Sequence, residues 1–301
     1  MLENITKIIK LLPGLNKGRF PYSNSLVIAD EEWGIIDTCP GEKPISLVPK
    51  EKISKVINTH FHIDHVAFNY LFDQSTFYIH HLDAGAFQGP EAFKGLTGFN
   101  ILRDTGPHLE QRIGRYPFGL EGVVELKDGD MIEVGKTRIT TIHTPGHCAG
   151  HCSFYVEEED VLFSGDIDLS SFGPWYGNYA SDIDQFIASV HKLIEIKPGC
   201  LVTSHAPVAR ENIRKRLLEY IGIIDARDEK ILQILRTPGS LEDIVAEKPI
   251  FKRYPNSDKL HSFFEGKMVA KHLQRLLRDG RIQQLEENIY VACSRRCQAG
   301  K

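Results

Sequence analysis

Short apolar runs separated by polar turns fill the first two thirds of the chain. Two of them, SLVIAD and WGIIDT, flank a polar turn at residues 30–32, and KVINTH and STFYIHH follow. Runs of this length between turn residues are typical of β-strands. Further strands are expected in 122–144 and 152–166, with a turn at Asp128 and Gly129. The pattern predicts a strand-rich N-terminal part.

A helical period replaces the strand pattern at residues 181–196. Apolar residues recur there three or four positions apart, so that Ile183, Phe186, Val190 and Ile194 share one face. A short buried strand, CLVTSHA, follows this helix. Strand-rich blocks interrupted by helices predict a mixed α/β fold up to about residue 207.

The stretch 84–122 shows neither the strand pattern nor the helical period. It is rich in Gly and Pro and carries several aromatic residues. We expect short helices and loops, forming an insertion or a lid, because long connections in compact domains are usually functional. Its aromatic residues either cover a site or pack against the core.

The last third is predominantly helical and ends in a hairpin pattern. Residues 208–235 are expected to form a connecting helix, and the sequence TPGS at 237–240 interrupts it. A helix capped by Ser240, a longer helix closed by Gly280 and a hairpin in 281–292 follow. Helix, helix and hairpin in this order outline a winged helix. We therefore predict two domains, 1–235 and 236–301.

Charge is distributed unevenly between these parts. Residues 236–301 carry 13 Lys and Arg against 8 Asp and Glu, although the whole chain has a net charge of −4. In the helix after residue 260, Lys267, Lys271, Arg275 and Arg278 form one basic stripe. Such a stripe is expected of a helix that binds phosphates, and equally of a solvated helix flank, so nucleic-acid binding is left open.

Composition is that of an ordinary globular protein, with 42% hydrophobic and 25% charged residues. The N-terminal residues lack the features of a signal peptide, and no apolar run reaches the ~20 residues of a membrane helix. The six scattered cysteines fit reduced thiols better than a disulfide framework. We expect a cytoplasmic protein with no membrane partner.

A cluster of metal-ligand side chains follows the KVINTH run. The stretch NTHFHIDHVAF holds His60, His62, Asp64 and His65 within six positions. In an extended loop, residues two apart point the same way, so His60 and His62 can reach one ion while Asp64 and His65 turn toward a second. Imidazole and carboxylate suit Zn²⁺, and also Fe or Mn.

Three distant segments supply similar residues. His147 lies in TIHTPGH, Asp166 in VLFSGD and His205 in LVTSHAP, each just after an apolar run. Strand-to-loop junctions are where α/β folds build their sites. Nearby, His151 is expected to be a satisfied non-ligand, and Asp168 either orients a ligand or is a solvated carboxylate.

HxHxDH, TPGH, SGD and SHxP, in this order, resemble the metallo-β-lactamase superfamily over residues 20–210. The resemblance implies a four-layer αβ/βα sandwich with a two-metal site at one edge, followed here by the winged helix. It implies a first metal on His60, His62 and His147, a second on Asp64, His65 and His205, and a bridging Asp166.

Two positions refine the resemblance. True two-zinc lactamases carry Cys where this chain has Asp166, and they usually lack the histidine at His65. The chain is thus more similar to glyoxalase II and, with its winged helix, to the beta-lactamase-like endoribonucleases. It departs from the usual Gly-His-Gly motif, because Ser204 and Ala206 flank His205.

The resemblance implies a hydrolase with two divalent metal ions, with Zn expected and Fe or Mn as alternatives. A metal-bridging hydroxide would attack an ester, a thioester or a similar small acyl substrate. Asp64 is the expected catalytic residue. The alternatives are a single-strand endoribonuclease, an iron-dependent redox enzyme and a DNA-binding regulator.

The segment after Asp166 supplies candidate substrate contacts. Trp175, Tyr176 and Tyr179 could stack on a base or hold an acyl chain, or simply pack. The expected partners are therefore a small acyl substrate or single-stranded RNA, and a homodimer is left open.

Overall fold

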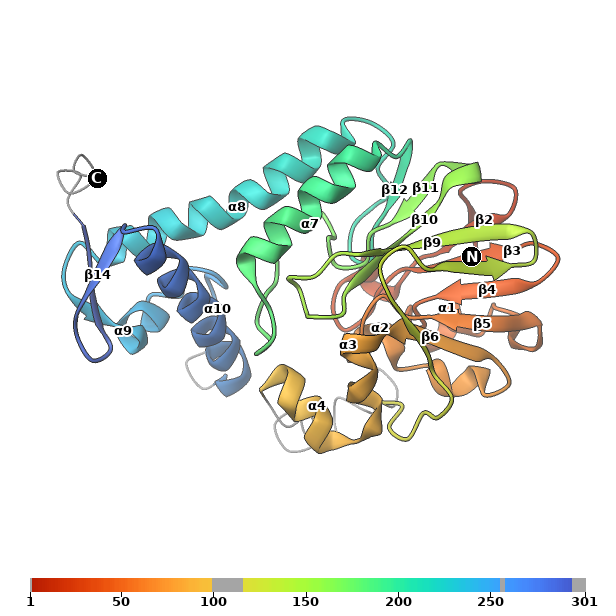
Figure 1. The fold of residues 1–301 in the computed structure, drawn as a ribbon, viewed down its shortest axis with the longest axis horizontal. Helices are drawn as coiled ribbons and strands as arrows, with labels where there is room; N and C mark the ends of the chain where they lie inside the picture. The colour runs from red at the N-terminus through yellow and green to blue at the C-terminus, as the bar shows by residue number, and fades with distance from the viewer. Residues whose placement is uncertain (1, 99–115, 255–257, 294–301) are drawn as a thin grey trace.

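The computed structural model describes residues 2–98, 116–254 and 258–293. A seven-stranded sheet with the strand order β1 to β7 is built from the N-terminal part (Figure 1). Its strands are β1 (Glu3–Asn4), β2 (Ile9–Leu12), β3 (Ser25–Ala29), β4 (Trp33–Ile36), β5 (Ile53–Ile57), β6 (Thr76–His80) and β7 (Val124–Leu126). Strands β4 to β7 run parallel to one another, so their carboxyl ends share one edge.

A five-stranded sheet with the order β12-β11-β10-β9-β8 packs on the first. Its strands are β8 (Met131–Val134), β9 (Thr137–His143), β10 (Cys152–Val156), β11 (Val161–Phe163) and β12 (Cys200–Val202). One apolar core between the sheets contains Ile28 and Ile36 from the first and Phe154 and Phe163 from the second. Burial of these side chains holds the two sheets face to face.

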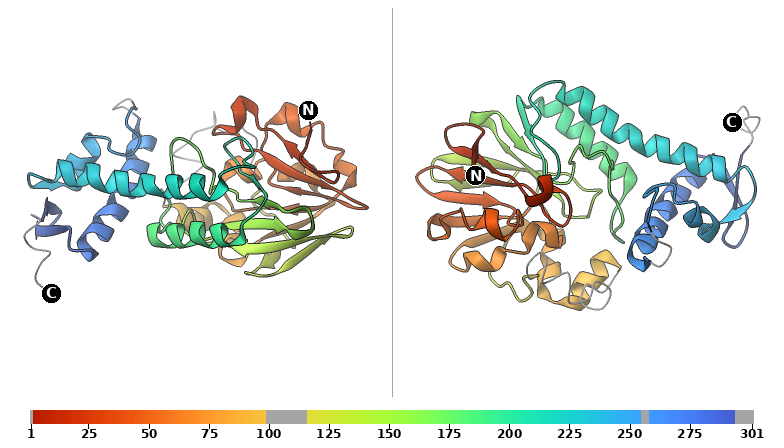
Figure 2. Two further views of the ribbon diagram at one scale, coloured as in Figure 1. Left: turned by 90° about the horizontal axis from the view of Figure 1, so that it is seen from above. Right: turned by 180° about the vertical axis from the view of Figure 1, so that it is seen from behind.

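Helices cover the outer face of each sheet, which gives four layers (Figure 2). The first sheet is covered by α1 (Glu42–Ile45), α2 (Ile63–Val66), α3 (His81–Ala84) and α4 (Pro90–Thr97), and the second by α7 (Ile183–Ile196) and the N-terminal half of α8 (Ile213–Ile234). The mixed α/β fold predicted from the sequence is therefore confirmed.

The predicted helical face at 181–196 is confirmed in α7. Ile183, Phe186, Val190 and Ile194 are buried, and the Asp182 side chain caps the helix by accepting from Gln185 N at 2.8 Å. A capping carboxylate satisfies an amide that the helix itself leaves unpaired.

A C-terminal module follows α8. It contains α9 (Leu241–Ala246), α10 (Lys259–Arg278) and a three-stranded sheet of β13 (Gly239–Ser240), β15 (Ile289–Ala292) and β14 (Ile282–Glu286). The C-terminal half of α8 packs into the core of this module through Ile224 and Ile231, as does Leu235 directly after the helix. Within the described ranges, no helix is both long and apolar enough to span a bilayer.

Two residues of the basic stripe of α10 pair with carboxylates of the rest of the protein, and a third donates to a main-chain oxygen. Arg278 pairs with Asp184 of α7, and Arg275 Nη1 lies 3.0 Å from Asp228 Oδ2 of α8. Lys271 Nζ donates to the carbonyl oxygen of Tyr179 at 3.3 Å. Helical periodicity located the stripe correctly, but it carried no information about which surface the stripe would face.

The described part of 84–122 packs against the core. Phe87, Phe93 and Tyr116 are buried on the outer face of the first sheet, and the Tyr116 hydroxyl donates to Phe61 O at 3.0 Å. These aromatic side chains therefore support the loop of His60 and His62 from behind. The lid interpretation falls partly on residues 99–115, which lie outside the described residues.

Candidate metal centre

Four chain segments bring their metal-type side chains to one end of the sandwich. The segment after β5 carries His60 and His62 and continues into α2, whose first turn holds Asp64 and His65. The loops that follow β9, β11 and β12 carry the remaining three residues: His147, Asp166 and His205. The seven residues named from the sequence thus lie together, in two groups.

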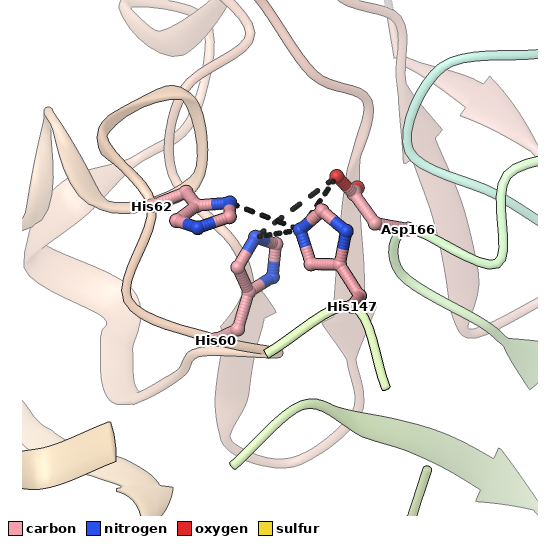
Figure 3. Close-up of side chains that lie close together, drawn as sticks. All are labelled: His60, His62, His147 and Asp166. Atoms are coloured by element: carbon pink, nitrogen blue, oxygen red, sulfur yellow. Dashed lines mark hydrogen bonds and ion pairs between the residues drawn. The ribbon is translucent and has the colours of Figure 1, made fainter. Parts of the chain in front are cut away.

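The first group contains His60, His62, His147 and Asp166 (Figure 3). His147 Nε2 lies 2.9 Å from His62 Nδ1 and 3.2 Å from His60 Nε2. Asp166 Oδ2 is 3.3 Å from the same His147 nitrogen. Three ring nitrogens converging on one point, with a carboxylate beside them, form a typical donor set for a divalent transition metal.

The second group contains Asp64, His65 and His205. Asp64 Oδ2 lies 3.6 Å from His205 Nε2 and 3.8 Å from His65 Nε2. The other oxygen of Asp166, Oδ1, is 3.1 Å from His65 Nε2 and 3.2 Å from His205 Nε2. Asp166 therefore presents one oxygen to each group, which is the placement of a bridging carboxylate.

Partners outside the cluster hold the second ring nitrogen of each of these histidines. The contacts are Thr59 Oγ1 to His60 Nδ1 at 2.9 Å, Asp37 Oδ2 to His65 Nδ1 at 2.7 Å, Trp175 O to His147 Nδ1 at 2.9 Å, Gly18 O to His205 Nδ1 at 2.5 Å and the Asn178 amide to His62 Nε2 at 2.5 Å. Such contacts fix the tautomer and aim the inner nitrogen at the ion.

Asn178 shows how its histidine can act as a ligand. Its Oδ1 has no hydrogen-bond partner among the residues that the structure describes, whereas its Nδ2 faces His62 Nε2. The two ends of an amide exchange by a half-turn. With Oδ1 toward the ring, His62 Nε2–H donates, and the Nδ1 lone pair points into the first group.

Two glycines allow the ligand-bearing turns to form. Gly146 has φ +127°, and a Cβ there would lie 2.3 Å from Phe186 N. Gly165 has φ +57°, and its Cβ would lie 2.6 Å from His151 Nε2. That nitrogen accepts from Asp166 N at 3.0 Å. His151 thus positions the backbone of Asp166 and is not itself one of the seven clustered residues.

The electrostatics of the cluster favour cations. Burial lowers the pKa of His60 and of His62 well below the usual range. For His205, burial acts in the same direction, but Asp166 and Asp64 outweigh it and raise the pKa to about 10. For Asp166, burial is outweighed by His65 and His205, and the pKa is lowered well below its ordinary value.

The donor atoms fit the metal ions that the sequence predicts. His65 Nε2 and Asp166 Oδ1 are buried and lie 3.1 Å apart, but neither has a well-aligned hydrogen bond to any of the described residues. A buried polar atom without a partner is costly, and a bound cation would satisfy both. Imidazole nitrogens and carboxylate oxygens are ligands for zinc, iron and manganese alike, so the donor set does not select among them.

The three aromatic candidates lie in different places. The Trp175 ring is partly buried, with its centroid 5.4 Å from that of His62 and 5.3 Å from that of His147. Tyr179 is 70% exposed. Tyr176 is fully buried, and its hydroxyl contacts His272 and Arg227. The interpretation of Tyr176 as a substrate contact is therefore corrected, because its surface is covered by protein.

Sequence reasoning missed the residues that hold the ligands. Asp37 directly follows the buried strand β4 and accepts from Thr59 N and Thr59 Oγ1, both at 2.8 Å, as well as facing His65. The position of this carboxylate directly after a buried strand is the sequence feature from which Asp37 could have been predicted. The carbonyls of Trp175 and Gly18 leave no signal, because every residue carries one.

Comparisons with known proteins agree with this architecture. The family model of the Metallo-beta-lactamase superfamily matches residues 18–205. The chain is 36% identical over 163 residues to an uncharacterized protein of Aquifex aeolicus (strain VF5), covering 50% of this chain and 69% of that protein. It is 28% identical over 158 residues to the acyl-coenzyme A thioesterase MBLAC2 of Homo sapiens, covering 50% of this chain and 54% of that protein.

Two further relatives cover more of the chain. An atrochrysone carboxyl ACP thioesterase of Claviceps purpurea (strain 20.1) is 24% identical over 272 residues, which are 82% of this chain and 73% of that protein. The crystal structure of a metallo-beta-lactamase family protein from Thermus thermophilus superposes with a TM-score of 0.77 at 22% identity, covering 96% of this chain and 100% of that chain. This last likeness concerns the fold alone.

The family match covers the segments that carry all seven clustered residues, from His60 to His205. The chain belongs to the metallo-β-lactamase superfamily, and it is an enzyme of that fold.

Proposed function

We propose that this enzyme is a metal-dependent thioesterase that hydrolyses an acyl thioester. The observation that carries the proposal is the pair of donor groups joined by the two oxygens of Asp166. The choice of thioesters is supported by two relatives, one from an animal and one from a fungus, that are both named thioesterases.

In this proposal His60, His62 and His147 hold one cation, Asp64, His65 and His205 hold the other, and Asp166 touches both. Bound at such a site, the cations supply an activated water molecule and a positive charge for the developing oxyanion. Asp64 would act as the base that takes the proton lost by the attacking water, since its carboxylate lies in the second group beside His65 and His205. Zinc is the expected metal, with iron or manganese as alternatives.

The substrate is proposed to enter past Trp175 and Tyr179. Two lysines of α10 lie at this position. Lys271 Nζ donates to Tyr179 O, and Lys267 Nζ lies 5.8 Å from the centre of the Tyr179 ring. Neither lysine forms an ion pair with a carboxylate in the described parts of the chain. Thioesters of coenzyme A and of carrier proteins carry phosphate, which these ammonium groups would attract.

We further propose that the C-terminal module is a winged helix that packs on the hydrolase instead of binding nucleic acid. The order α9, α10 and the β14–β15 hairpin supports the first part. The ion pairs of Arg275 and Arg278 with α7 and α8 support the second, because they occupy the basic stripe.

The test is a turnover screen of the full chain after loading with Zn²⁺. Acyl-coenzyme A thioesters, oxygen esters, β-lactams, phosphodiesters and short single-stranded RNAs are compared, with Asp166→Ala as the matched inactive variant. We expect thioester turnover that is lost in Asp166→Ala. Cleavage of RNA without thioester turnover would establish the endoribonuclease alternative and overturn this proposal.

A further inference from the structure

The loop between β11 and α7 carries the outer partners of two metal-site histidines. Trp175 O faces His147 Nδ1, and the Asn178 amide faces His62 Nε2. The direction of a main-chain carbonyl is set by the backbone conformation of its own segment and not by a side-chain rotamer. The orientation of His147 therefore depends on whatever holds residues 172–178, which we call the anchored loop.

Arg227 of α8 holds the backbone just before Trp175 and the side chain of the residue just after it. Its Nη2 donates to Phe172 O at 2.7 Å, and its Nη1 donates to Pro174 O and, at 2.9 Å, to the Tyr176 hydroxyl. The guanidinium is buried and lies 4.9 Å from the centre of the Phe172 ring. A buried guanidinium needs its donors satisfied, so these bonds are strongly favoured.

Tyr176 connects the anchored loop to the C-terminal module. Burial raises the pKa of Tyr176 to about 12, so the hydroxyl keeps its proton and donates to His272 Nε2 at 2.7 Å. His272 Nδ1 in turn donates to Asp228 Oδ1 at 2.6 Å. Both ring nitrogens of this α10 histidine thus have a partner, and the hydrogen bonds are continuous from α10 to the anchored loop.

We propose that the buried chain Asp228–His272–Tyr176–Arg227 is a positioning network that sets the metal affinity of His147 and His62 from outside the metal centre. The inference rests on the metal site of the proposed function. It gives the C-terminal module a role in that site, because His272 belongs to α10.

A purely structural role would have a different consequence. Buried polar groups need partners anywhere in a protein, and losing one destabilises the fold. Such a loss would lower the melting temperature without distinguishing the two donor groups. A positioning role weakens the group of His60, His62 and His147 selectively, because the hydrogen bonds from the anchored loop to metal-site histidines, within the described residues, go to His147 and His62.

The experiment uses the full chain and Tyr176→Phe, which removes one oxygen and keeps the buried ring. The stepwise dissociation constants of Zn²⁺ are measured by chelator competition, and the visible spectrum of the Co²⁺-loaded protein reports ligand geometry. We expect about tenfold weaker binding at one of the two steps, with an altered cobalt spectrum, since partners outside the ligand shell typically change affinity 10–100-fold. His272→Gln, on a different element, is expected to weaken the same step.

The control is Ile244→Val, which trims an apolar side chain of the same C-terminal core and removes no hydrogen bond of the network. An unchanged Zn²⁺ affinity in Tyr176→Phe would overturn the inference. So would equal weakening in Ile244→Val at the same loss of melting temperature. Failure of the proposed function would show differently, as a wild-type chain that binds no metal. The two failures are therefore distinguishable.

Discussion

At the scale of single residues, the metal centre depends on side chains that touch no ion. Asp37 illustrates this, because its buried carboxylate accepts from Thr59 and faces His65 Nδ1. A carboxylate in this position fixes the tautomer of His65 and strengthens it as a ligand.

Replacing Asp37 by Asn is therefore expected to weaken metal binding at the group of Asp64, His65 and His205 about 10–100-fold. Binding at the other group should be unchanged. Stepwise zinc affinities from chelator competition provide the measurement. Asp130→Asn, which alters an exposed turn carboxylate bonded to Lys127 N, is the control and should bind as the wild type does. Equal weakening of both steps would argue against a local role for Asp37.

Asp83 makes a separate prediction about pH. It is buried, accepts from Gly150 N at 2.7 Å and from Cys148 Sγ at 3.1 Å, and burial raises its pKa to about 7. The folded state then holds this proton more tightly than the unfolded state, whose pKa stays near 3.8. The contribution to stability is present below about pH 4 and is lost as pH rises toward 7.

Asp83→Asn should remove this loss of stability, so that the free energy of unfolding depends less on pH between pH 4 and 7. The effect is on the order of a few kcal/mol, because one pKa unit corresponds to about 1.4 kcal/mol. Urea unfolding of both proteins at several pH values, compared as a difference, isolates Asp83 from the other titrating groups. Parallel pH profiles would contradict the raised pKa.

Sequence could identify the seven clustered residues because their types are distinctive and each follows an apolar run. It could not identify their supports. Trp175 acts through its main-chain oxygen, and Tyr176, whose aromatic type suggests a substrate contact, is a buried member of a hydrogen-bond network. Hydrogen bonding between distant segments is a tertiary property that leaves no local pattern.

At the scale of elements, periodicity found most strands and helices, but it could not assign strands to sheets. The turn at Asp128 and Gly129 was expected between two successive apolar runs. In the structure it separates β7, which pairs with β6, from β8, which pairs with β9 in the other sheet. Strand propensity is local, whereas the choice of sheet depends on which core each strand buries.

The turn before His147 offers a test at this scale. In Gly146→Ala the new Cβ would lie 2.3 Å from Phe186 N and 2.4 Å from Phe186 Cα, at a φ that disfavours side chains. We expect a loss of about 2 kcal/mol or more in stability, together with reduced zinc content, because His147 must move. Thermal melts and elemental analysis provide the measurements.

Gly129→Ala is a matched control for this substitution. Its φ of +85° is also positive, but nothing lies within 4 Å of the added Cβ. It should therefore show the backbone strain alone and keep its metal. Equal metal loss in both variants would show that packing against α7 is not what places His147.

At the scale of the whole molecule, the uneven charge finds its explanation in the contact between the two parts. The basic residues Arg275 and Arg278 of the C-terminal module pair with Asp228 and Asp184 of the acidic larger part. Opposite charges thus meet across the contact and stabilise this arrangement. The remaining lysines of the stripe, Lys267 and Lys271, lie beside Tyr179.

Neutralising both lysines as Lys267→Gln and Lys271→Gln is expected to raise KM about tenfold for a coenzyme A thioester. An ion pair near the surface is worth about 0.2–1 kcal/mol, and about 0.7 kcal/mol from each of the two lysines corresponds to this factor. The value of kcat, and all parameters for an uncharged thioester, should stay unchanged. Lys192→Gln, which removes a surface partner of Asp128, is the control. An equal rise in KM for both substrates would contradict phosphate attraction.

Helix α8 belongs to two apolar cores at once. Leu217 and Tyr220 in its first half complete the core under the second sheet, whereas Ile224 and Ile231 in its second half complete that of the C-terminal module. Because one rigid element serves both, neither core can come apart without exposing apolar surface of the other. The two parts therefore unfold as one cooperative unit, and a chain shortened to the hydrolase part alone would end in a half-covered helix prone to self-association.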